Sequence, residues 1–469
     1  MKLRLLTTRR APAAEAIHGL EPFRSTDLWA GKLFVQLYGH RVRFCNRRGG
    51  WYVYDGKRWV RAETGEIERL AKELPPFLLR LASEEADTDR RGGMAKCAAR
   101  LESVQKLQAV LEMASTEEGV CIAPTTFDTD PFKFNVQNGT LVIDAKKATV
   151  RLQPHRPEDL LTHISPAEWR GIDAPAPVYM RFLSESSGGD QELVGFRQRF
   201  AGYTMTGDTR EQVFIYAFGP PVGGKGTDTR AHTYVLGSYA QAAEMATFLD
   251  LRQDKTRNDL AGLAGSRLVV ATETPEGRAF NEELIKKLTG QDTISARFLF
   301  KEYFEFRATF KIRFEGNHRP QVRTGDGAFW RRVLVVPFEH PVPESKRDRL
   351  LGEKLQSPGE CAGILAWMVR GCLDWLRGGL RVPQKVKAAV AEYREAEDQV
   401  ARFLDEMCDT GEGRRCLSVT LYQRYNGWAL TGGETPLTKV AFGMRLDEKG
   451  FRRDRDHRTR LGLSLRIGG

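Results

Sequence analysis

Residues 213–227 read VFIYAFGPPVGGKGT, an apolar run that breaks into a glycine-rich turn ending in a lysine. Gly219, Gly224 and Lys225 stand at the spacing G-x-x-x-x-G-K of a phosphate-binding loop. In such a loop a buried strand leads into a turn whose backbone N–H groups surround a phosphate, and the lysine contacts the phosphate oxygens. The alternative interpretation is a glycine-rich surface turn that carries a lysine.

The residue after the lysine departs from the usual pattern. A serine or threonine hydroxyl normally stands there and binds Mg²⁺, whereas this chain has Gly226, followed by Thr227. Residues 228–237, DTRAHTYVLG, are also more polar than an ordinary buried helix. We therefore expect that Thr227 or water holds the metal, or that the site is weakened.

A second short apolar strand follows about forty residues later, at Leu268–Ala271, and Glu273 lies just past its end. In an α/β nucleotide-binding fold, a strand beside the strand of the glycine-rich loop places an acid near the terminal phosphate. There the acid orients water or holds the metal. The alternative is that Glu273 is a solvated loop residue.

Two further motifs follow in the next segment of the chain. Residues 286–320 read KKLTGQDTISARFLFKEYFEFRATFKIRFEGNHRP, which predicts a short helix, a turn and then strands ending at Asn317. DGAFWRRVLVVPF follows at 326–338. The order of these motifs resembles superfamily 3 helicases, and more narrowly the helicase module of phage and plasmid primase–helicases of the poxvirus type. Residues 135–166 and 196–219 are similar to the upstream stretches of that family, so the resemblance covers nearly the whole chain.

The resemblance implies a role for each matching residue. Lys225 would bind the β- and γ-phosphates of ATP, Glu273 would be the Walker B acid, and Asn317 would be the polar sensor. Arg331 or Arg332 would reach a neighbouring subunit's site as an arginine finger, and the spacing to Asn317 favours Arg332. The nucleotide cradle would comprise Gly219, Pro220, Gly223, Gly224, Lys225, Gly226 and Thr227, with Thr227 and Glu273 holding Mg²⁺.

A hairpin around Lys301 resembles the element that such helicases push into their central channel. Arg297 and Lys301 stand among Phe298, Phe300 and Tyr303, and this mixture of cations and rings suits single-stranded DNA. The alternative is a strand pair whose aromatic side chains belong to the core, which is what we expect for Phe304 and Phe306.

The chain divides into five expected segments. They are a leader at 1–20, an α+β accessory domain at 21–170, an ATPase core at 178–345, a helical segment at 346–400 and a winged-helix-like domain at 401–469. In the last domain a basic β-ribbon would contact DNA, although a charge run is often only a solvated face. Its arginines are Arg452, Arg453, Arg455, Arg458 and Arg460.

Composition is consistent with a polyanionic partner. The chain has 469 residues, a formal net charge of +11 and a pI near 9.3, which favours nucleic acid. Seven cysteines without a C-x-x-C pair argue against a zinc ribbon or a disulfide framework. With no signal peptide and no bilayer-spanning run, we expect a soluble cytoplasmic protein that does not bind a membrane.

The sequence thus predicts an α/β fold: an AAA+-like ATPase core with an α+β accessory domain and a winged-helix-like domain. The expected activity is that of an ATP- and Mg²⁺-dependent DNA helicase or translocase of phage, prophage or plasmid replication. It would work as a homo-oligomeric, hexameric ring on single-stranded DNA, contact duplex through its C-terminal domain and depend on a separate primase. Two alternatives remain: a DNA-binding initiator or scaffold with a decayed ATPase, and an ATPase that packages or remodels nucleic acid without unwinding it.

Overall fold

The computed structural model describes residues 20, 22–250, 258–273, 277–297, 303–323, 326–434 and 436–466. The N-terminal part of this range is a helical module with a small antiparallel sheet of order β1-β2-β3. Its apolar residues form a separate core that includes Leu33, Phe34 and Leu78. The elements are α2 (Asp27–Tyr38), β1 (Val42–Cys45), β2 (Gly50–Tyr54), β3 (Trp59–Arg61), α3 (Glu66–Ala71), α4 (Leu74–Glu84), α5 (Thr88–Leu101) and α6 (Val104–Ser115).

A second antiparallel sheet joins this module to the rest of the protein. It consists of β4 (Lys133–Val136), β5 (Gly139–Asp144) and β6 (Thr149–Gln153). Phe134 and Leu141 of this sheet belong to the same apolar cluster as Ile215 and Trp367. One core therefore crosses the boundaries that were expected near 170–178 and at 345.

The centre of the molecule is a five-stranded parallel sheet of order β13-β7-β12-β9-β8. Its strands are β7 (Phe214–Phe218), β8 (Ala240–Ala242), β9 (Leu268–Ala271), β12 (Lys311–Gly316) and β13 (Val333–Pro337). The sheet confirms the α/β class. It also corrects the expected neighbour of β7, because β12 separates β9 from β7. Continuous apolar strands leave no sign in the sequence of which strand lies next to which.

Helices and loops cover both faces of this sheet. Alternate residues of β7 point in opposite directions, so that Ile215 joins one apolar cluster and Tyr216 the other. The first face is covered by α7 (Pro177–Ser186), α8 (Gln191–Thr204), α9 (Lys225–Leu236) and α14 (Pro358–Gly378). The second face is covered by α10 (Asn258–Ala261), α11 (Glu282–Thr289), α12 (Gly327–Trp330), α15 (Gln384–Ala396) and the hairpin of β10 (Thr293–Ala296) and β11 (Phe304–Arg307).

The C-terminal residues form a small module with its own core around Phe403 and Tyr425. Residues 384–407 form two helices, α15 and α16, because Asp398 caps α16 by accepting a hydrogen bond from the N–H of Ala401 at 2.9 Å. The remaining elements are α13 (Leu351–Leu355), α16 (Gln399–Met407), β14 (Cys408–Leu417), α17 (Ser418–Thr431), α18 (Lys439–Glu448) and β15 (Thr459–Leu465). Short 3₁₀ turns are η1 (Asn46–Arg48), η2 (Pro124–Thr126), η3 (Pro157–Asp159), η4 (Gly237–Tyr239), η5 (Met245–Phe248) and η6 (Glu344–Lys346).

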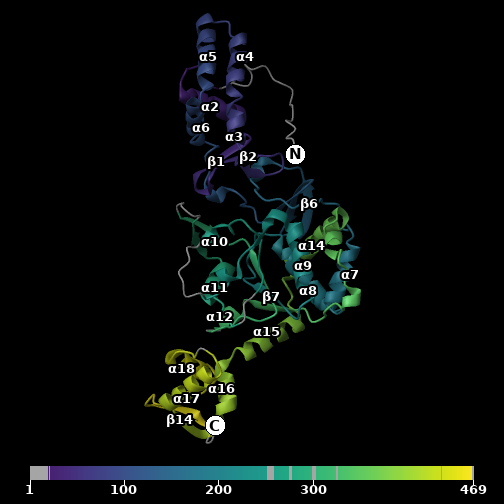
Figure 1. The fold of residues 1–469 in the computed structure, drawn as a ribbon, viewed down its shortest axis with the longest axis vertical. Helices are drawn as coiled ribbons and strands as arrows, with labels where there is room; N and C mark the ends of the chain where they lie inside the picture. Colours follow the sequence, from purple (N-terminus) through teal and green to yellow (C-terminus); the bar gives the residue numbers. More distant parts are fainter. Residues whose placement is uncertain are drawn as a thin grey trace.

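The three parts follow one another along the long axis of the molecule (Figure 1). The N-terminal helices lie at one end, the parallel sheet with its helices lies in the middle, and the C-terminal module lies at the other end, with α15 leading into it. No helix in the described ranges has the length and apolar character that a membrane crossing requires.

Candidate functional site

The glycine-rich turn connects the end of β7 to the start of α9 and packs tightly against the segment that follows β13. A Cβ atom on Gly219 would come within 2.2 Å of the carbonyl oxygen of Phe338, and one on Gly223 within 2.7 Å. Gly224 has φ of +93° and directly precedes α9. Glycine is therefore required at these positions by close backbone approach and by a left-handed conformation.

Lys225, the first residue of α9, turns its ammonium group back over this turn. Its Nζ donates hydrogen bonds to the carbonyl oxygens of Gly219 at 2.6 Å and Pro220 at 2.8 Å, and to Oδ1 of Asn317 at 3.0 Å. Burial lowers the pKa of Lys225, and the nearby carboxylate of Glu315 partly opposes that shift. The structure thus brings together the predicted lysine and the predicted polar sensor, which follow adjacent parallel strands.

A pocket of about 610 Å³ opens beside this turn. Gly223, Gly224, Lys225, Gly226, Thr227 and Asn317 line it. Its other walls come from α7, with Val178, Arg181, Phe182 and Glu185, and from residues Val342, Arg347, Asp348 and Leu351 beyond β13. The pocket combines backbone N–H groups at a helix start, a lysine and an apolar wall, which is an arrangement suited to a phosphorylated ligand.

Glu273 lies at the same edge of the sheet but outside the lining of this pocket. It follows β9 by two residues, is exposed and has φ of +63°. Because parallel strands end at one edge, Glu273 and Asn317 both lie on the carboxyl side of the sheet. The structure gives Glu273 no contact with Lys225 or Thr227, so its role stays a prediction.

The two candidate finger arginines differ sharply in exposure. Arg332 is only 7% exposed, and its guanidinium donates to Oγ1 of Thr289 at 3.2 Å and to the carbonyl oxygen of Ala328. Arg331 is exposed at the amino end of β13. The geometry therefore favours Arg331, the reverse of the order that sequence spacing favoured, because a group that reaches a neighbouring subunit must be free to leave its own.

A buried cluster of charges, which the sequence reasoning missed, lies under α9. Asp228 is 1% exposed and accepts hydrogen bonds from Arg197 of α8 at 2.8 Å and from Arg313 of β12 at 2.8 Å. Burial acts to raise the pKa of Asp228, but the two guanidinium charges outweigh it and hold that pKa well below its usual range. The polar character of residues 228–237 was the sequence signal that could have indicated this buried cluster.

Two further groups extend this cluster. Glu315 accepts from Arg313 Nε at 3.2 Å and from the hydroxyl of Thr229, and burial raises its pKa against the opposing charge of Arg313. His232 lies 3.8 Å from Asp228, and burial lowers its pKa to about 4. The imidazole is therefore neutral at pH 7, and the two arginines neutralise Asp228. These contacts fix α9 to both α8 and β12.

The hairpin expected to contact DNA is present as β10 and β11, paired from Thr293↔Arg307 to Ala296↔Phe304. Phe304 is buried at 7% exposure, as expected of a core residue, and Phe306 packs against the same cluster. The guanidinium of Arg297 stacks over the ring of Tyr303 at 4.8 Å. Phe298, Phe300 and Lys301 lie outside the described residues.

The basic ribbon of the C-terminal module divides into exposed and buried arginines. Arg452, Arg453, Arg455 and Arg458 are exposed. Arg460 is instead 1% exposed and donates to the carbonyl oxygens of Phe451 at 2.7 Å and Gly443 at 2.8 Å, and to Asp447. Arg460 is thus corrected from a surface contact to a structural residue that holds α18 against β15.

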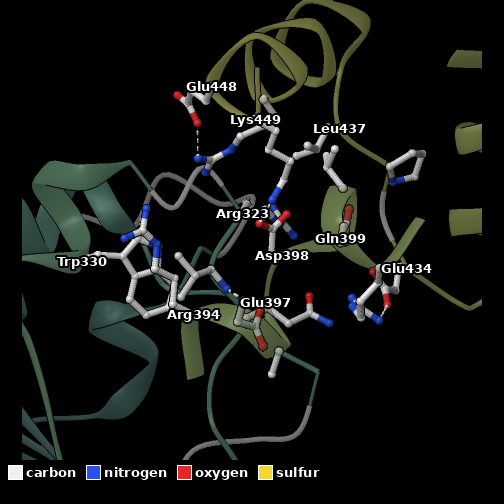
Figure 2. Close-up of a pocket in the computed structure, with 17 residues that line it drawn as sticks. Arg323, Trp330, Arg394, Glu397, Asp398, Gln399, Glu434, Leu437, Glu448 and Lys449 are labelled. Carbon is white, nitrogen blue, oxygen red and sulfur yellow. Dashed lines mark hydrogen bonds and ion pairs between the residues drawn. The ribbon is translucent and has the colours of Figure 1, made fainter. Parts of the chain in front are cut away.

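Figure 2 shows a second pocket, of about 520 Å³, where the central part meets the C-terminal module. Several of its charged residues pair with one another: Lys449 with Asp398, Arg445 with Glu448 at 2.9 Å, and Arg402 with Glu434 at 2.7 Å. Glu397 accepts from the N–H of Val322 at 2.9 Å. This pocket is therefore a poorer candidate for an anionic ligand than the pocket beside Lys225.

The described residues contain no group of three or more His, Cys, Asp or Glu side chains arranged to hold a metal. Mg²⁺ commonly binds one or two protein groups together with waters and substrate phosphates. Thr227, which lines the pocket, fits such a site, and Glu273 is at the correct edge of the sheet.

Parts of the chain are similar to known proteins. Residues 31–188 match the family described as "D5 N terminal like". The chain is 26% identical over 245 residues to "Putative helicase L207/L206" of Acanthamoeba polyphaga mimivirus, covering 48% of this chain and 25% of that protein. It is 25% identical over 257 residues to "Putative helicase 022R" of Frog virus 3 (isolate Goorha), covering 51% of this chain and 26% of that protein. The chain spans about a quarter of the length of these curated relatives.

Among solved structures, the apo structure of the NrS-1 C terminal region (305-718) aligns with 94% of this chain and 99% of that chain, at 11% identity and a TM-score of 0.49. The resemblance to the primase–helicase family is confirmed by the family match and by the viral relatives.

Proposed function

We propose that this chain is an ATP-dependent DNA helicase or translocase of phage, prophage or plasmid replication. The observation that carries the proposal is the meeting of Lys225 and Asn317, 3.0 Å apart at the carboxyl ends of adjacent strands, beside a pocket large enough for a nucleotide. The names of the viral relatives support a helicase. The α/β fold with its parallel sheet is compatible with an ATPase core.

In this proposal, ATP enters the pocket with its phosphates at the start of α9. The phosphates replace the carbonyl oxygens of Gly219 and Pro220 as partners of the Lys225 ammonium, and the N–H groups of the turn bind the phosphate oxygens. Asn317, released from Lys225, orients the attacking water near the γ-phosphate. Glu273 would polarise that water, and Thr227 and Glu273 would hold Mg²⁺, which would supply positive charge beside the phosphates.

The proposed active assembly is a ring, hexameric by family resemblance. Arg331 precedes β13, whereas the glycine-rich turn follows β7, and the two strands run parallel in register. Five residues of strand separate them by about 17 Å along the sheet, so Arg331 lies at the end of the sheet opposite its own site. A finger at this position therefore serves the neighbouring subunit. Hydrolysis around the ring would move the hairpins that carry Arg297 and Lys301 along single-stranded DNA.

The exposed arginines Arg452, Arg453, Arg455 and Arg458 would contact duplex phosphates beside a winged-helix-like module. Primer synthesis would come from a separate primase. The proposed setting is the cytoplasm of the host cell.

A second candidate is a DNA-binding initiator or scaffold with an inactive ATPase. Gly226 has no hydroxyl, and Glu273 is exposed and outside the pocket lining. Both observations favour this candidate over an active motor.

The test is ATP hydrolysis by the purified full chain, with and without single-stranded DNA, beside Lys225→Ala. DNA-stimulated turnover that disappears in the variant supports the motor. Turnover no higher than that of the variant, with salt-sensitive DNA binding retained, refutes it in favour of the scaffold.

A further inference from the structure

The first turn of α9 has open space where a hydroxyl would normally stand. Gly226 is exposed, and a Cβ built on it meets no atom within 4 Å. The residue lines the pocket next to Lys225 and Thr227. Because a glycine there covers nothing, the floor of the pocket beside the lysine is accessible to another side chain.

Arg230 lies one helical turn further along α9, four residues from Gly226, and the two share one face of the helix. Arg230 is exposed and lines the same pocket. Side chains of a helix lean toward its amino end and cover the turn before their own Cα atom. Arg230 is therefore within reach of the position that Gly226 leaves open, although no side chain occupies that position in this structure.

The Arg230 guanidinium has no hydrogen-bond or ion-pair partner within the described parts of the chain, so no protein group there needs to be displaced before it binds a ligand. Another arginine of the pocket is already engaged, since Nε of Arg347 donates to the carbonyl oxygen of Val342 at 3.1 Å. Arg181 is on the opposite wall, on α7 beside Phe182. Arg230 is thus the arginine that the helix itself directs toward the lysine end of the pocket.

We propose that Arg230 binds the phosphate chain of the nucleotide in cis and takes over part of the charge compensation that a hydroxyl-held Mg²⁺ provides at other phosphate-binding loops. This inference rests on the proposed function, because it assumes that the pocket binds ATP. A guanidinium presents a planar set of donors that matches phosphate oxygens, and such charge-assisted bonds are about twice as strong as neutral ones. In this proposal the arginine at residue 230 compensates for the hydroxyl that residue 226 lacks.

The experiment is equilibrium binding of a fluorescent ATP analogue to the full chain, with Mg²⁺ and with EDTA. Arg230→Ala is expected to weaken binding about 10-fold to 100-fold in both conditions, the range typical of a lost hydrogen bond to a charged group. Arg230→Lys, which keeps the charge but not the planar donors, is expected to lose less. Arg349→Ala removes an exposed arginine that does not line the pocket, and it is the control for net charge.

A second variant restores the missing hydroxyl. Gly226→Ser fits the open space and is expected to make binding more dependent on Mg²⁺. In the double variant Arg230→Ala with Gly226→Ser, affinity should recover to within a few-fold of the natural chain with Mg²⁺ and stay low in EDTA. Recovery in both conditions would overturn the proposed exchange of arginine for metal.

The outcomes separate this inference from the proposed function. If Lys225→Ala abolishes binding but Arg230→Ala binds like the natural chain, the pocket binds nucleotide and the role of Arg230 is wrong. If Arg349→Ala loses as much affinity as Arg230→Ala, the effect is one of net charge and the inference is again wrong. If the natural chain binds no ATP, the proposed function and the inference fall together.

Discussion

Replacing Asp228 with asparagine should destabilise the central part of the protein more than any single exposed charge would. The change keeps the volume of the side chain but removes a charge that lies 2.8 Å from both Arg197 and Arg313. Glu315 would then be the remaining carboxylate for two buried guanidinium groups, and of these two it is bonded to Arg313, at 3.2 Å. Removing one partner of a buried ion pair costs about 3–5 kcal/mol, because an uncompensated charge stays buried.

The assay is guanidinium-induced unfolding at pH 7, followed by the near-ultraviolet signal of the aromatic side chains around this cluster. Trp367 stacks on His232 at 5.9 Å and packs against Tyr179 at 5.1 Å, so its environment reports the cluster directly. The control is Asp409→Asn, which breaks two exposed pairs, with Arg414 and Arg466, and should leave the transition nearly unchanged. A loss below about 1 kcal/mol for Asp228→Asn would refute the reasoning, since typical substitutions without a buried charge reach that value.

Four further outcomes are expected. Lys225→Ala should abolish ATP hydrolysis while DNA binding, measured by anisotropy, stays largely intact. Arg331→Ala should lower kcat by about 10³-fold or more without changing the melting temperature. Arg332→Ala should lower the melting temperature, because its hydrogen bonds to Thr289 and Ala328 are lost. Equal melting temperatures for the two variants would contradict the assignment. Burial lowers the pKa of His232 to about 4 in the folded protein, against 6.5 in the unfolded chain. The unfolded chain therefore takes up the proton first, and the free energy of unfolding should fall by about 3 kcal/mol from pH 6.5 to 4. His232→Gln should remove this pH dependence. Arg455→Ala should weaken DNA binding and reduce its salt dependence, and a salt slope like that of the natural chain would exclude the contact.

Local spacing was sufficient to predict the parts of the site that depend on consecutive residues. A strand, a glycine-rich turn and a lysine follow from residues 213–225. Gly224 has a left-handed conformation that the turn itself imposes, whereas Gly219 and Gly223 are required by the close approach of Phe338, which is distant in sequence. Asn317 was assigned through the family resemblance rather than from spacing. The structure explains its contact with Lys225, because the two residues follow adjacent parallel strands that end at one edge of the sheet.

Burial of a charged side chain could not be predicted in the same way. Arg331 and Arg332 are neighbours in the sequence, and several other arginines lie near Arg460. The sequence does not distinguish the arginine that is buried from the arginines that are exposed. The structure makes the distinction through partners that are distant in sequence, such as Thr289 for Arg332. The domain boundaries were obscured for a related reason, because α14 and the sheet of β4–β6 complete one core from opposite ends of the chain.

The segment after β12 joins the pocket beside Lys225 to α15, the helix that leads into the C-terminal module. Two residues beyond Asn317, the guanidinium of Arg319 lies 4.1 Å over the ring of Phe218, the last residue of β7, and pairs with Glu392 of α15 at 2.9 Å. Tyr393 of α15 bonds to the carbonyl oxygen of Pro320. A phosphate that draws Asn317 away from Lys225 therefore acts on a short turn already fixed to α15, and α15 leads directly to α16 and the exposed arginines beyond. This continuity is the physical reason to expect that the state of the pocket and the position of the C-terminal module change together.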